Sequence, residues 1–386
     1  MITDPVVDPD IHDVRNVVRQ FVRERLNEES VRSTASADGI DKDSWKLMAE
    51  LGWTGLGIPE EFGGAGLGVT ELCVLLQELG GALAPVPFLS TAGMAVAALR
   101  MAASHEASER LLPQIAEGTA HSAVVLGSSN GWPGQGHDTI GAQQRASGWT
   151  LSGHSSYCLD ADRAQPLLVV AAVGANSYGL FGIEPGAVGV VVRQVPAVDI
   201  TRKLVDLTFD AAPADALHAQ PLTPEQVASV VDTMAVLLAA EATGSAQRCL
   251  ETTLEYLRTR HQFGKPIGSF QALKHRCAEM AVTLTMAKEL VFAAAGTADA
   301  ESQKSLRIAA PLALTRALEV STHIAEEGIQ LHGGIGFTDE AAVGMYYKRA
   351  LSDTELLAHS VDVRARLARV LADDAAYRQV NSRRAA

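Results

Sequence analysis

Apolar residues recur at helical spacing in the first and last parts of this 386-residue chain. Over residues 11–29 they share one side of a helical projection, and charged residues lie on the opposite side. From Val227 to Leu238 they recur at i, i+3, i+4 and i+7, which places them on one buried face. Similar patterns predict further helices over 44–52, 70–80, 90–103 and 106–117. Residues 1–120 are therefore predicted to form a helical domain.

The middle of the chain has a different pattern. Short apolar runs are separated by Gly, Asn, Asp and Pro, and no helical period connects them. The predicted strands are 123–126, 149–152, 167–173, 178–183, 188–192 and 204–209. Such a series predicts a small β-barrel or sandwich over residues 121–222. Residues 211–223, with Pro213 and Pro221, are expected to form a linker.

A pair of long helices is predicted in the third part, residues 223–386. Residues 223–226 read Thr-Pro-Glu-Gln, which is a typical helix start with a capping Thr and a Gln at the third helical position. Gly264 and Pro266 end the helix, and Ser269 is predicted to cap the next one. The chain is therefore an α+β protein in the order helix, β, helix.

The net charge of −13, without any basic block, excludes two classes of partner. Nucleic acid and anionic membrane surfaces attract clustered Lys and Arg, so we expect neither here. No run approaches the roughly 18 apolar residues of a membrane span, and the acidic amino terminus does not resemble a signal peptide. The cysteines lack metal-ligand spacing, which indicates a reducing compartment. They are Cys73, Cys158, Cys249 and Cys277. We expect a cytoplasmic protein without a metal site.

The turn between the two long helices is crowded with hydrogen-bond donors. Arg260, Gln262, Lys265 and Gln271 all lie within it. A guanidinium surrounded by amides is suited to phosphate or another anion, so the turn predicts a ligand site. Arg260 and Gln271 would serve equally well to satisfy helix ends and solvent, so the turn taken alone leaves both interpretations open.

Three runs of sequence resemble one known family. Arg260-His-Gln-Phe-Gly-Lys-Pro-Ile-Gly-Ser-Phe-Gln271 closely resembles the turn in the C-terminal helical domain of the acyl-CoA dehydrogenases. Residues 330–338, Gln-Leu-His-Gly-Gly-Ile-Gly-Phe-Thr, resemble that family's second flavin-contacting loop. Residues 58–64, Ile-Pro-Glu-Glu-Phe-Gly-Gly, resemble its first domain. The order of domains also matches, so the resemblance spans nearly the whole chain.

The resemblance implies an enzyme that uses FAD to oxidise an acyl-CoA between Cα and Cβ, with electrons passed to an electron-transfer flavoprotein. In that family an Arg and a Gln-x-x-Gly-Gly loop hold the FAD pyrophosphate and adenine, often across a subunit interface. Helices 225–262 and 269–295 are apolar over most of their length, so we also expect a dimer or tetramer built on them. The expected FAD contacts are Arg260, Gln262, Phe263, Gln271, Gln330, Gly333, Gly334 and Tyr157.

Two segments of the β region depart from the family pattern. The usual Thr-Glu-Pro-x-Ala-Gly-Ser-Asp motif is absent, and residues 127–134 read Gly-Ser-Ser-Asn-Gly-Trp-Pro-Gly instead. In the segment from Gly153 to Leu159, Tyr157 keeps the aromatic ring that packs near the isoalloxazine. Leu159 replaces the hydroxyl that normally hydrogen-bonds to the N5 edge of the ring. We expect this loss to alter how a flavin is poised.

The catalytic carboxylate is missing from both positions where the family places it. Removal of the α-proton requires a general base. Counting from Gln330, the position in the later loop holds Leu357, followed by Ala358. Counting back from Arg260, the position on the long helix holds Met234. Neither side chain can accept a proton.

Three nearby carboxylates are candidate replacements. Glu241 follows Met234 by two helical turns, so it faces nearly the same way but lies about 10 Å further along the axis. Asp232 and Glu355 each lie two residues from an expected position, on the wrong face of an undistorted helix. Each would also be explained by an ion pair, and Glu241 beside His275 or Arg276 is the expected example.

Three hypotheses follow from these residues. The first is an acyl-CoA dehydrogenase that transfers electrons to an electron-transfer flavoprotein. The second is a non-catalytic subunit that completes the flavin site of a partner, as in the branch of the family that forms α2β2 tetramers of unlike chains. The third is a related flavin oxidase or monooxygenase, which would form hydrogen peroxide in air.

Overall fold

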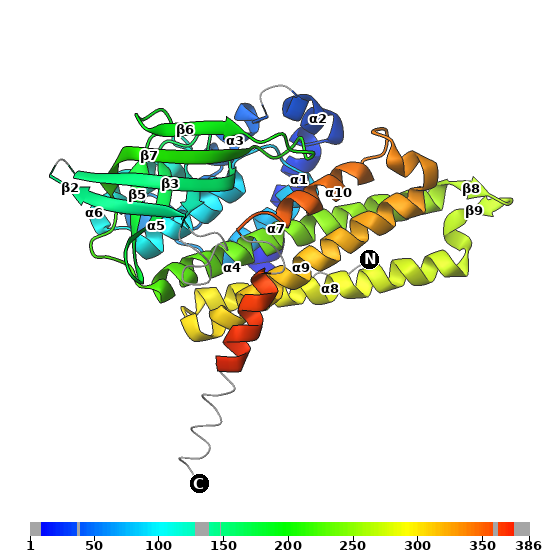
Figure 1. Ribbon diagram of the computed structural model, residues 1–386. Coiled ribbons are helices and arrows are strands. Elements are labelled where there is room, and N and C mark those ends of the chain that lie inside the picture. The colour runs from blue at the N-terminus through cyan, green and yellow to red at the C-terminus, as the bar shows by residue number, and fades with distance from the viewer. Residues whose placement is uncertain (1–8, 37–38, 128–138, 147, 358–361, 374–386) are drawn as a thin grey trace, which may run out of the picture.

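The computed structural model describes residues 9–36, 39–127, 139–146, 148–357 and 362–373. Figure 1 shows a β-sheet at one end of the molecule, the first helices between that end and the middle, and long helices extending to the other end. This is the predicted arrangement of a helical first part, a β middle and long C-terminal helices, and the fold class is confirmed.

The first part is helical because its apolar stripes pack on one another and on the long central helix. The expected helix over 11–29 is in fact two, since the Asn27 side chain accepts a hydrogen bond from the Ser30 amide and starts a second helix. Asp41 caps the third in the same way. The elements are α1 (Pro9–Arg25), α2 (Glu28–Ser36), α3 (Lys42–Glu50), α4 (Val69–Gly81), the π-helical η3 (Phe88–Ala95), α5 (Val96–Ala102) and α6 (His105–Ala116).

The middle part is a closed sheet of seven strands, as the prediction of a barrel or sandwich requires. The strands are β1 (Ala123–Leu126), β2 (Ile140–Arg145), β3 (Gly148–Leu159), β4 (Leu167–Gly174), β5 (Ser177–Ile183), β6 (Val190–Gln194) and β7 (Leu204–Ala216). Their order is β1-β4-β2-β3-β7-β5, with β5 also pairing β4 and β6 pairing β7. The circuit β4-β2-β3-β7-β5 therefore returns to β4.

Two details of the β region differ from the sequence prediction. Strand β2 was not predicted, because its sequence Ile-Gly-Ala-Gln-Gln-Arg has a single β-branched residue and only two buried positions. The expected linker over 211–223 was wrong in its first half. Strand β7 continues to Ala216, and Pro213 faces Thr150 across the β3–β7 ladder.

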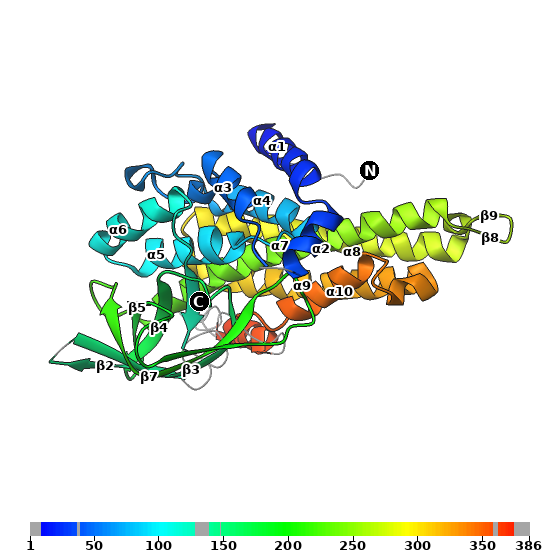
Figure 2. The same cartoon turned by 90° about the horizontal axis from the view of Figure 1, so that it is seen from above.

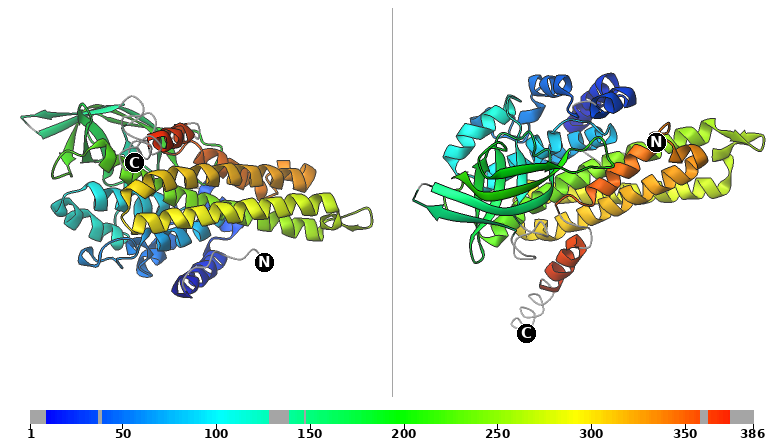
Figure 3. Two further views of the ribbon diagram at one scale, coloured as in Figure 1. Left: turned by 90° about the horizontal axis from the view of Figure 1, so that it is seen from below. Right: turned by 45° about the horizontal axis from the view of Figure 1, so that its top comes forward.

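The last part consists of α7 (Pro224–Thr259), α8 (Gln271–Asp299), α9 (Gln303–His332) and α10 (Val343–Asp353), and a further helical segment covers residues 362–373. Thr223 and Gln226 form the predicted capping box at the start of α7. The predicted Ser269 cap was wrong, because Ser269 lies in the 3-10 turn η4 (Ile267–Ser269) and Phe270 precedes α8 without a side-chain cap. Figures 2 and 3 show α7, α8 and α9 running side by side along the bundle.

Helix α7 is the core of the molecule. It packs against α4, α8 and α9, and Gly244 lies so close to α4 that a Cβ there would stand 1.9 Å from the Gln77 carbonyl oxygen. By length and composition α7 could cross a membrane, but 94% of its most apolar window is buried inside the protein. Its apolar run is explained by this buried position.

Candidate functional site

The turn between α7 and α8 is a short hairpin at the far end of the bundle. Strands β8 (His261–Gln262) and β9 (Lys265–Pro266) pair antiparallel. Phe263 and Gly264 between them have φ angles of +54° and +77°. Positive φ at both central residues is typical of a type I′ hairpin turn, which glycine tolerates without strain. Figures 1 and 2 place this hairpin at the end of the bundle away from the sheet.

The hairpin presents its polar side chains to the outside. Arg260, Gln262 and Gln271 are exposed, and the Phe263 side chain is 89% exposed. Across the described ranges, no carboxylate lies within ion-pair distance of Arg260. Gln271 contacts the His275 ring at 2.8 Å. The sequence leaves open whether these donors bind a ligand or only satisfy helix ends and solvent, and the exposed position of Arg260 is compatible with both.

The loop after α9 lies beside this hairpin end. Helix α9 ends at His332, whose ring stacks on Tyr256 of α7 with centroids 4.3 Å apart. His332 Nδ1 lies 2.7 Å from the Gly328 carbonyl oxygen, and burial lowers the pKa of the imidazole, so the ring is neutral and donates through Nδ1. Gly333 has φ +66°, and a Cβ on Gly333 or on Gly334 would meet no atom within 4 Å. This backbone is open to close approach by a ligand.

The second region is a cavity of about 270 Å³ between the sheet and the end of α10. Tyr157 reaches it because strand β3 is irregular between Ser155 and Cys158, which gives Tyr157 a φ of +56°. The Tyr157 side chain is 42% exposed. The lining residues are Met94, Val124, Leu126, Thr139, His154, Ser155, Ser156, Tyr157, Cys158, Leu159, Glu355, Leu356 and Leu357.

Leu159 and Leu357, which the resemblance predicts at positions that are usually polar, both line the cavity beside polar residues such as Thr139, His154 and Glu355. Met234 is 0% exposed in the α7 core, where a carboxylate would be desolvated. Within the sequence departure at 127–134, only Gly127 lies among the described residues, and Ala358 lies outside them.

The three candidate bases occupy different environments. Asp232 accepts two hydrogen bonds from Arg366 Nη2, at 2.8 and 2.9 Å, and both side chains are buried. Glu241 is buried against Arg202, so the expected partners His275 and Arg276 were wrong. Arg276 instead pairs with Glu327 of α9. Of the three, only Glu355 lines the cavity.

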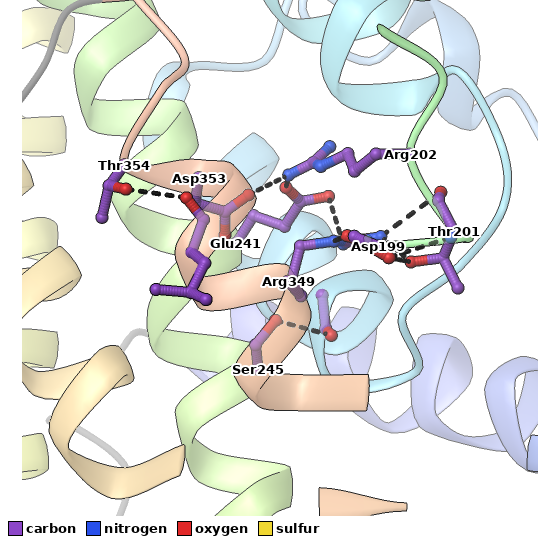
Figure 4. Close-up of polar contacts among 10 residues, drawn as sticks. Asp199, Thr201, Arg202, Glu241, Ser245, Arg349, Asp353 and Thr354 are labelled. Carbon is purple, nitrogen blue, oxygen red and sulfur yellow. Dashed lines mark hydrogen bonds and ion pairs between the residues drawn. The ribbon is translucent and has the colours of Figure 1, made fainter. Parts of the chain in front are cut away.

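Arg202 and Glu241 belong to a buried cluster of charges at the end of α10, next to the residues that line the cavity. Arg202 lies in the connection between β6 and β7, and its Nη2 donates both to Glu241 and to Asp353 Oδ1, the latter at 2.7 Å. Figure 4 shows these side chains meeting between α7 and α10. Burial raises the pKa of Asp353 to about 6, although Arg202 and Arg349 act in the opposite direction.

The other half of the cluster is built on Arg349, the largest fully buried side chain. Its Nε donates to Asp199 Oδ2 at 2.7 Å and its Nη2 donates to the Thr201 hydroxyl at 2.6 Å. Burial alone would raise the pKa of Asp199, but Arg349, the Thr201 hydrogen bond and Arg202 together lower it. Asp199 is therefore held ionised inside the protein.

The cluster was not predicted from the sequence. Asp199-Ile-Thr-Arg202 is a short polar run between strands, and Asp199 accepts hydrogen bonds from the Thr201 amide and hydroxyl. A local turn of this kind is readable in a sequence. Its pairing with Arg349 and Asp353, about 150 positions away, carries no spacing signal.

The described residues contain no group of three or more His, Cys, Asp or Glu side chains that could hold a metal ion. The predicted FAD contacts fall in two places. The hairpin and the α9 loop lie together at the exposed end of the bundle, whereas Tyr157 lies in the cavity beside the sheet.

Comparison with known proteins agrees with this architecture. Family profiles described as acyl-CoA dehydrogenase, N-terminal domain, and acyl-CoA dehydrogenase, C-terminal domain, match residues 8–119 and 225–359. The chain is 33% identical over 356 residues to acyl-CoA dehydrogenase IpdE2 of Mycobacterium tuberculosis, covering 92% of this chain and 95% of that protein.

Two solved structures are also similar. A variant of the Tcur3481-Tcur3483 steroid ACAD has a TM-score of 0.85 and 29% identity, covering 95% of this chain and 99% of that chain. A chain of the ChsE4-ChsE5 complex of Mycobacterium tuberculosis has a TM-score of 0.85 and 25% identity, with coverage of 96% and 99%.

Proposed function

We propose that this chain, which belongs to the acyl-CoA dehydrogenase family of FAD-dependent oxidoreductases, is the supporting subunit of a heteromeric acyl-CoA dehydrogenase. In this proposal the chain holds part of the FAD and leaves abstraction of the α-proton to a partner chain. One observation carries it. Both positions where the family places its base are apolar here, with Met234 buried in α7 and Leu357 lining the cavity.

FAD fits the exposed end of the bundle. The guanidinium of Arg260 has a fork of donors that matches a pyrophosphate, and the open backbone at Gly333 and Gly334 allows close approach. Gln262, Phe263, Gln271 and Gln330 lie on the same exposed surface. When bound, FAD supplies the acceptor for the hydride that leaves Cβ. Tyr157, in the other region, would pack beside the flavin ring.

The remaining carboxylates are poor bases for geometric reasons. Asp232 is enclosed with Arg366, and Glu241 with Arg202. A base must lie within hydrogen-bond reach of the proton that it removes, and neither Asp232 nor Glu241 lines the cavity. In this proposal the chain therefore binds and orients, and a partner supplies the proton acceptor.

A partner chain fits the exposed apolar side chains. Phe263 and Phe337 are 89% and 81% exposed at the end of the bundle, and Val282 and Met286 are exposed on the outer face of α8. Large apolar side chains grouped on one surface favour an interface. The ChsE4-ChsE5 structure is a complex of two differently named chains. We propose assembly with another acyl-CoA dehydrogenase-like chain, acyl-CoA as substrate and an electron-transfer flavoprotein as electron acceptor.

One observation favours a second candidate function, which is a dehydrogenase that acts with its own base. Glu355 lines the cavity beside Leu357, and a shift of the segment after α10 would exchange their places. In that case Glu355 would abstract the α-proton. A flavin oxidase is a further alternative, and hydrogen peroxide production in air would identify it.

The test is anaerobic mixing of acyl-CoAs with the purified chain, alone and with its copurifying partner, while the flavin absorbance is followed. A positioned base is worth about 10²–10⁴-fold in rate. We expect bleaching by the complex at a rate larger than that of the lone chain by about this factor, and dependent on a Glu of the partner. Rapid bleaching by the lone chain that Glu355→Gln abolishes would contradict the proposal. Arg193→Gln is a surface control.

A further inference from the structure

Arg202 is joined through the backbone to one wall of the cavity. The next residue, Lys203, accepts a hydrogen bond from the Asp160 amide at 2.8 Å through its carbonyl oxygen. Leu204 then pairs with Leu159 at the end of β3. Strand β3 carries Tyr157 and Leu159 into the cavity, so a displacement of residue 202 is transmitted directly to this wall.

The side chain of Arg202 is joined to the opposite wall. Its hydrogen bond to Asp353 holds the last residue of α10, and residues 355–357 line the cavity immediately afterwards. Arg349 lies one turn earlier on the same face of α10 and is bonded to Asp199 and Thr201. The segment 199–202 therefore holds the end of α10 at two successive turns.

We propose that Arg202 is a positioning residue that sets the separation between the β3 wall and the α10 wall of the cavity. The inference rests on the proposed function in taking this cavity as the place where the flavin ring and the acyl thioester meet. Arg202 would touch neither of them. Its effect is to hold Tyr157 on one side and residues 355–357 on the other at a fixed distance.

Direction and burial distinguish this role from general stabilisation. Nη2 of Arg202 donates both to Glu241 of the buried helix α7 and to Asp353 of α10. The guanidinium therefore joins both walls of the cavity to the core helix. Within the described residues, Arg202 Nε and Asp353 Oδ2 have no hydrogen-bond partner. Arg349 Nη1 lies 3.8 Å from Glu241 Oε1 and compensates for part of the charge, but the described residues show no other hydrogen bond to the Asp353 carboxylate that would replace the one from Arg202.

A competing role is that Arg202 only neutralises buried carboxylates. The two roles predict different behaviour when the charges are removed together. The variant Arg202→Met/Glu241→Gln/Asp353→Asn removes the guanidinium together with both carboxylates that it hydrogen-bonds, so a counter-charge role toward those two carboxylates would be relieved. A positioning role would not be relieved, because the hydrogen bond from Arg202 to α10 is still lost, and the segment is then joined to the helix at one turn, through Arg349, instead of two.

The first measurement is hydrogen exchange of the full chain, followed by mass spectrometry of its peptides. In Arg202→Met we expect exchange to rise at least about tenfold at residues 154–160 and 351–357, with α3 unchanged as the reference. Lys348→Met removes an exposed ion pair to Asp339 from the same helix α10 and should change neither peptide. Unchanged exchange at residues 351–357 in Arg202→Met would overturn the proposal.

The triple variant is the test to use if Arg202→Met unfolds, or if its exchange rises in every peptide including α3. Wall peptides that still exchange faster while α3 regains its protection support positioning. Wall peptides that regain full protection overturn it, because Arg202 then acts only as a counter-charge.

A second measurement links the walls to ligand binding. With FAD as the probe and the chain in the assembly in which it purifies, we expect Arg202→Met and the triple variant to bind FAD about tenfold more weakly, with a changed visible spectrum. Equal affinity and spectrum in a stable triple variant would count against the proposal. If the unmodified assembly binds no FAD, the proposed function fails, and the exchange experiment still tests the role of Arg202.

Discussion

The exposed end of the bundle and the cavity beside the sheet differ in the chemical groups that they present to a ligand. At the exposed end, the Arg260 turn and the Gly333–Gly334 loop keep donors, positive-φ backbone and open space. In the cavity, Leu159 and Leu357 lie at positions that the resemblance predicts to be polar, and Glu355 is the carboxylate among the described lining residues. The exposed end therefore offers several groups suited to holding a cofactor, whereas the cavity offers few that could move a proton.

This difference shows that binding and chemistry impose separate demands on the chain. A nucleotide is held by backbone shape and exposed cations, which cost little stability at the surface. A catalytic carboxylate must be kept partly buried without a strong partner, which is costly. When a partner supplies the base, the buried carboxylates are free to be paired with arginines, as Asp232 and Glu241 are.

The contrast between the two regions would be wrong if the buried carboxylates were catalytic rather than structural. Arg366→Met removes the buried guanidinium that gives Asp232 two hydrogen bonds, so we expect a loss of about 3 to 5 kcal/mol in the free energy of unfolding. Denaturant unfolding followed by circular dichroism measures it. Arg364→Met, which removes an exposed pair with Glu319, is the control and should cost less than about 1 kcal/mol. A stable Arg366→Met chain with altered flavin reduction would point to Asp232 as a base.

Removal of a guanidinium from the exposed end should affect the cofactor and leave the fold intact. Arg260→Ala is expected to weaken FAD binding by about 2 to 3 kcal/mol, or roughly 30- to 150-fold in dissociation constant, because charged hydrogen bonds to phosphate are lost. Flavin fluorescence titration of the assembled protein measures it. Arg258→Ala, which changes an exposed residue in the last turn of α7, should bind FAD normally. Full flavin retention by Arg260→Ala would remove the assignment of this site.

The cavity side should respond to pH through Asp353. Burial raises its pKa from 3.8 to about 6 in the folded chain, so the folded state binds the proton more tightly than the unfolded state. This contribution to stability is complete below about pH 4 and is lost as the pH rises through 6. The stability of the parent chain relative to Asp353→Asn should therefore fall by about 2 kcal/mol between pH 4 and pH 7. Parallel stability curves would show that Asp353 is not buried as described.

The periodic elements and the turn at the exposed end follow from local sequence patterns. Helical spacing and the Thr223 capping box predict α7, and the residues from Arg260 to Gln271 predict a turn rich in donors. These features are local, since a cap or a turn requires residue types within a few positions of one another. Local reasoning also showed that Met234 and Leu357 cannot act as bases.

The partners of the buried carboxylates, in contrast, depend on how the whole chain packs. Glu241 pairs with Arg202 rather than with His275 or Arg276, and Arg202 reaches Asp353 across 151 positions of sequence. Strand β2 forms because β3 and β4 offer it hydrogen bonds, although its own sequence is a weak strand former. A buried charge can be paired by any element that packs against it, so its partner is chosen by the packing of the whole chain.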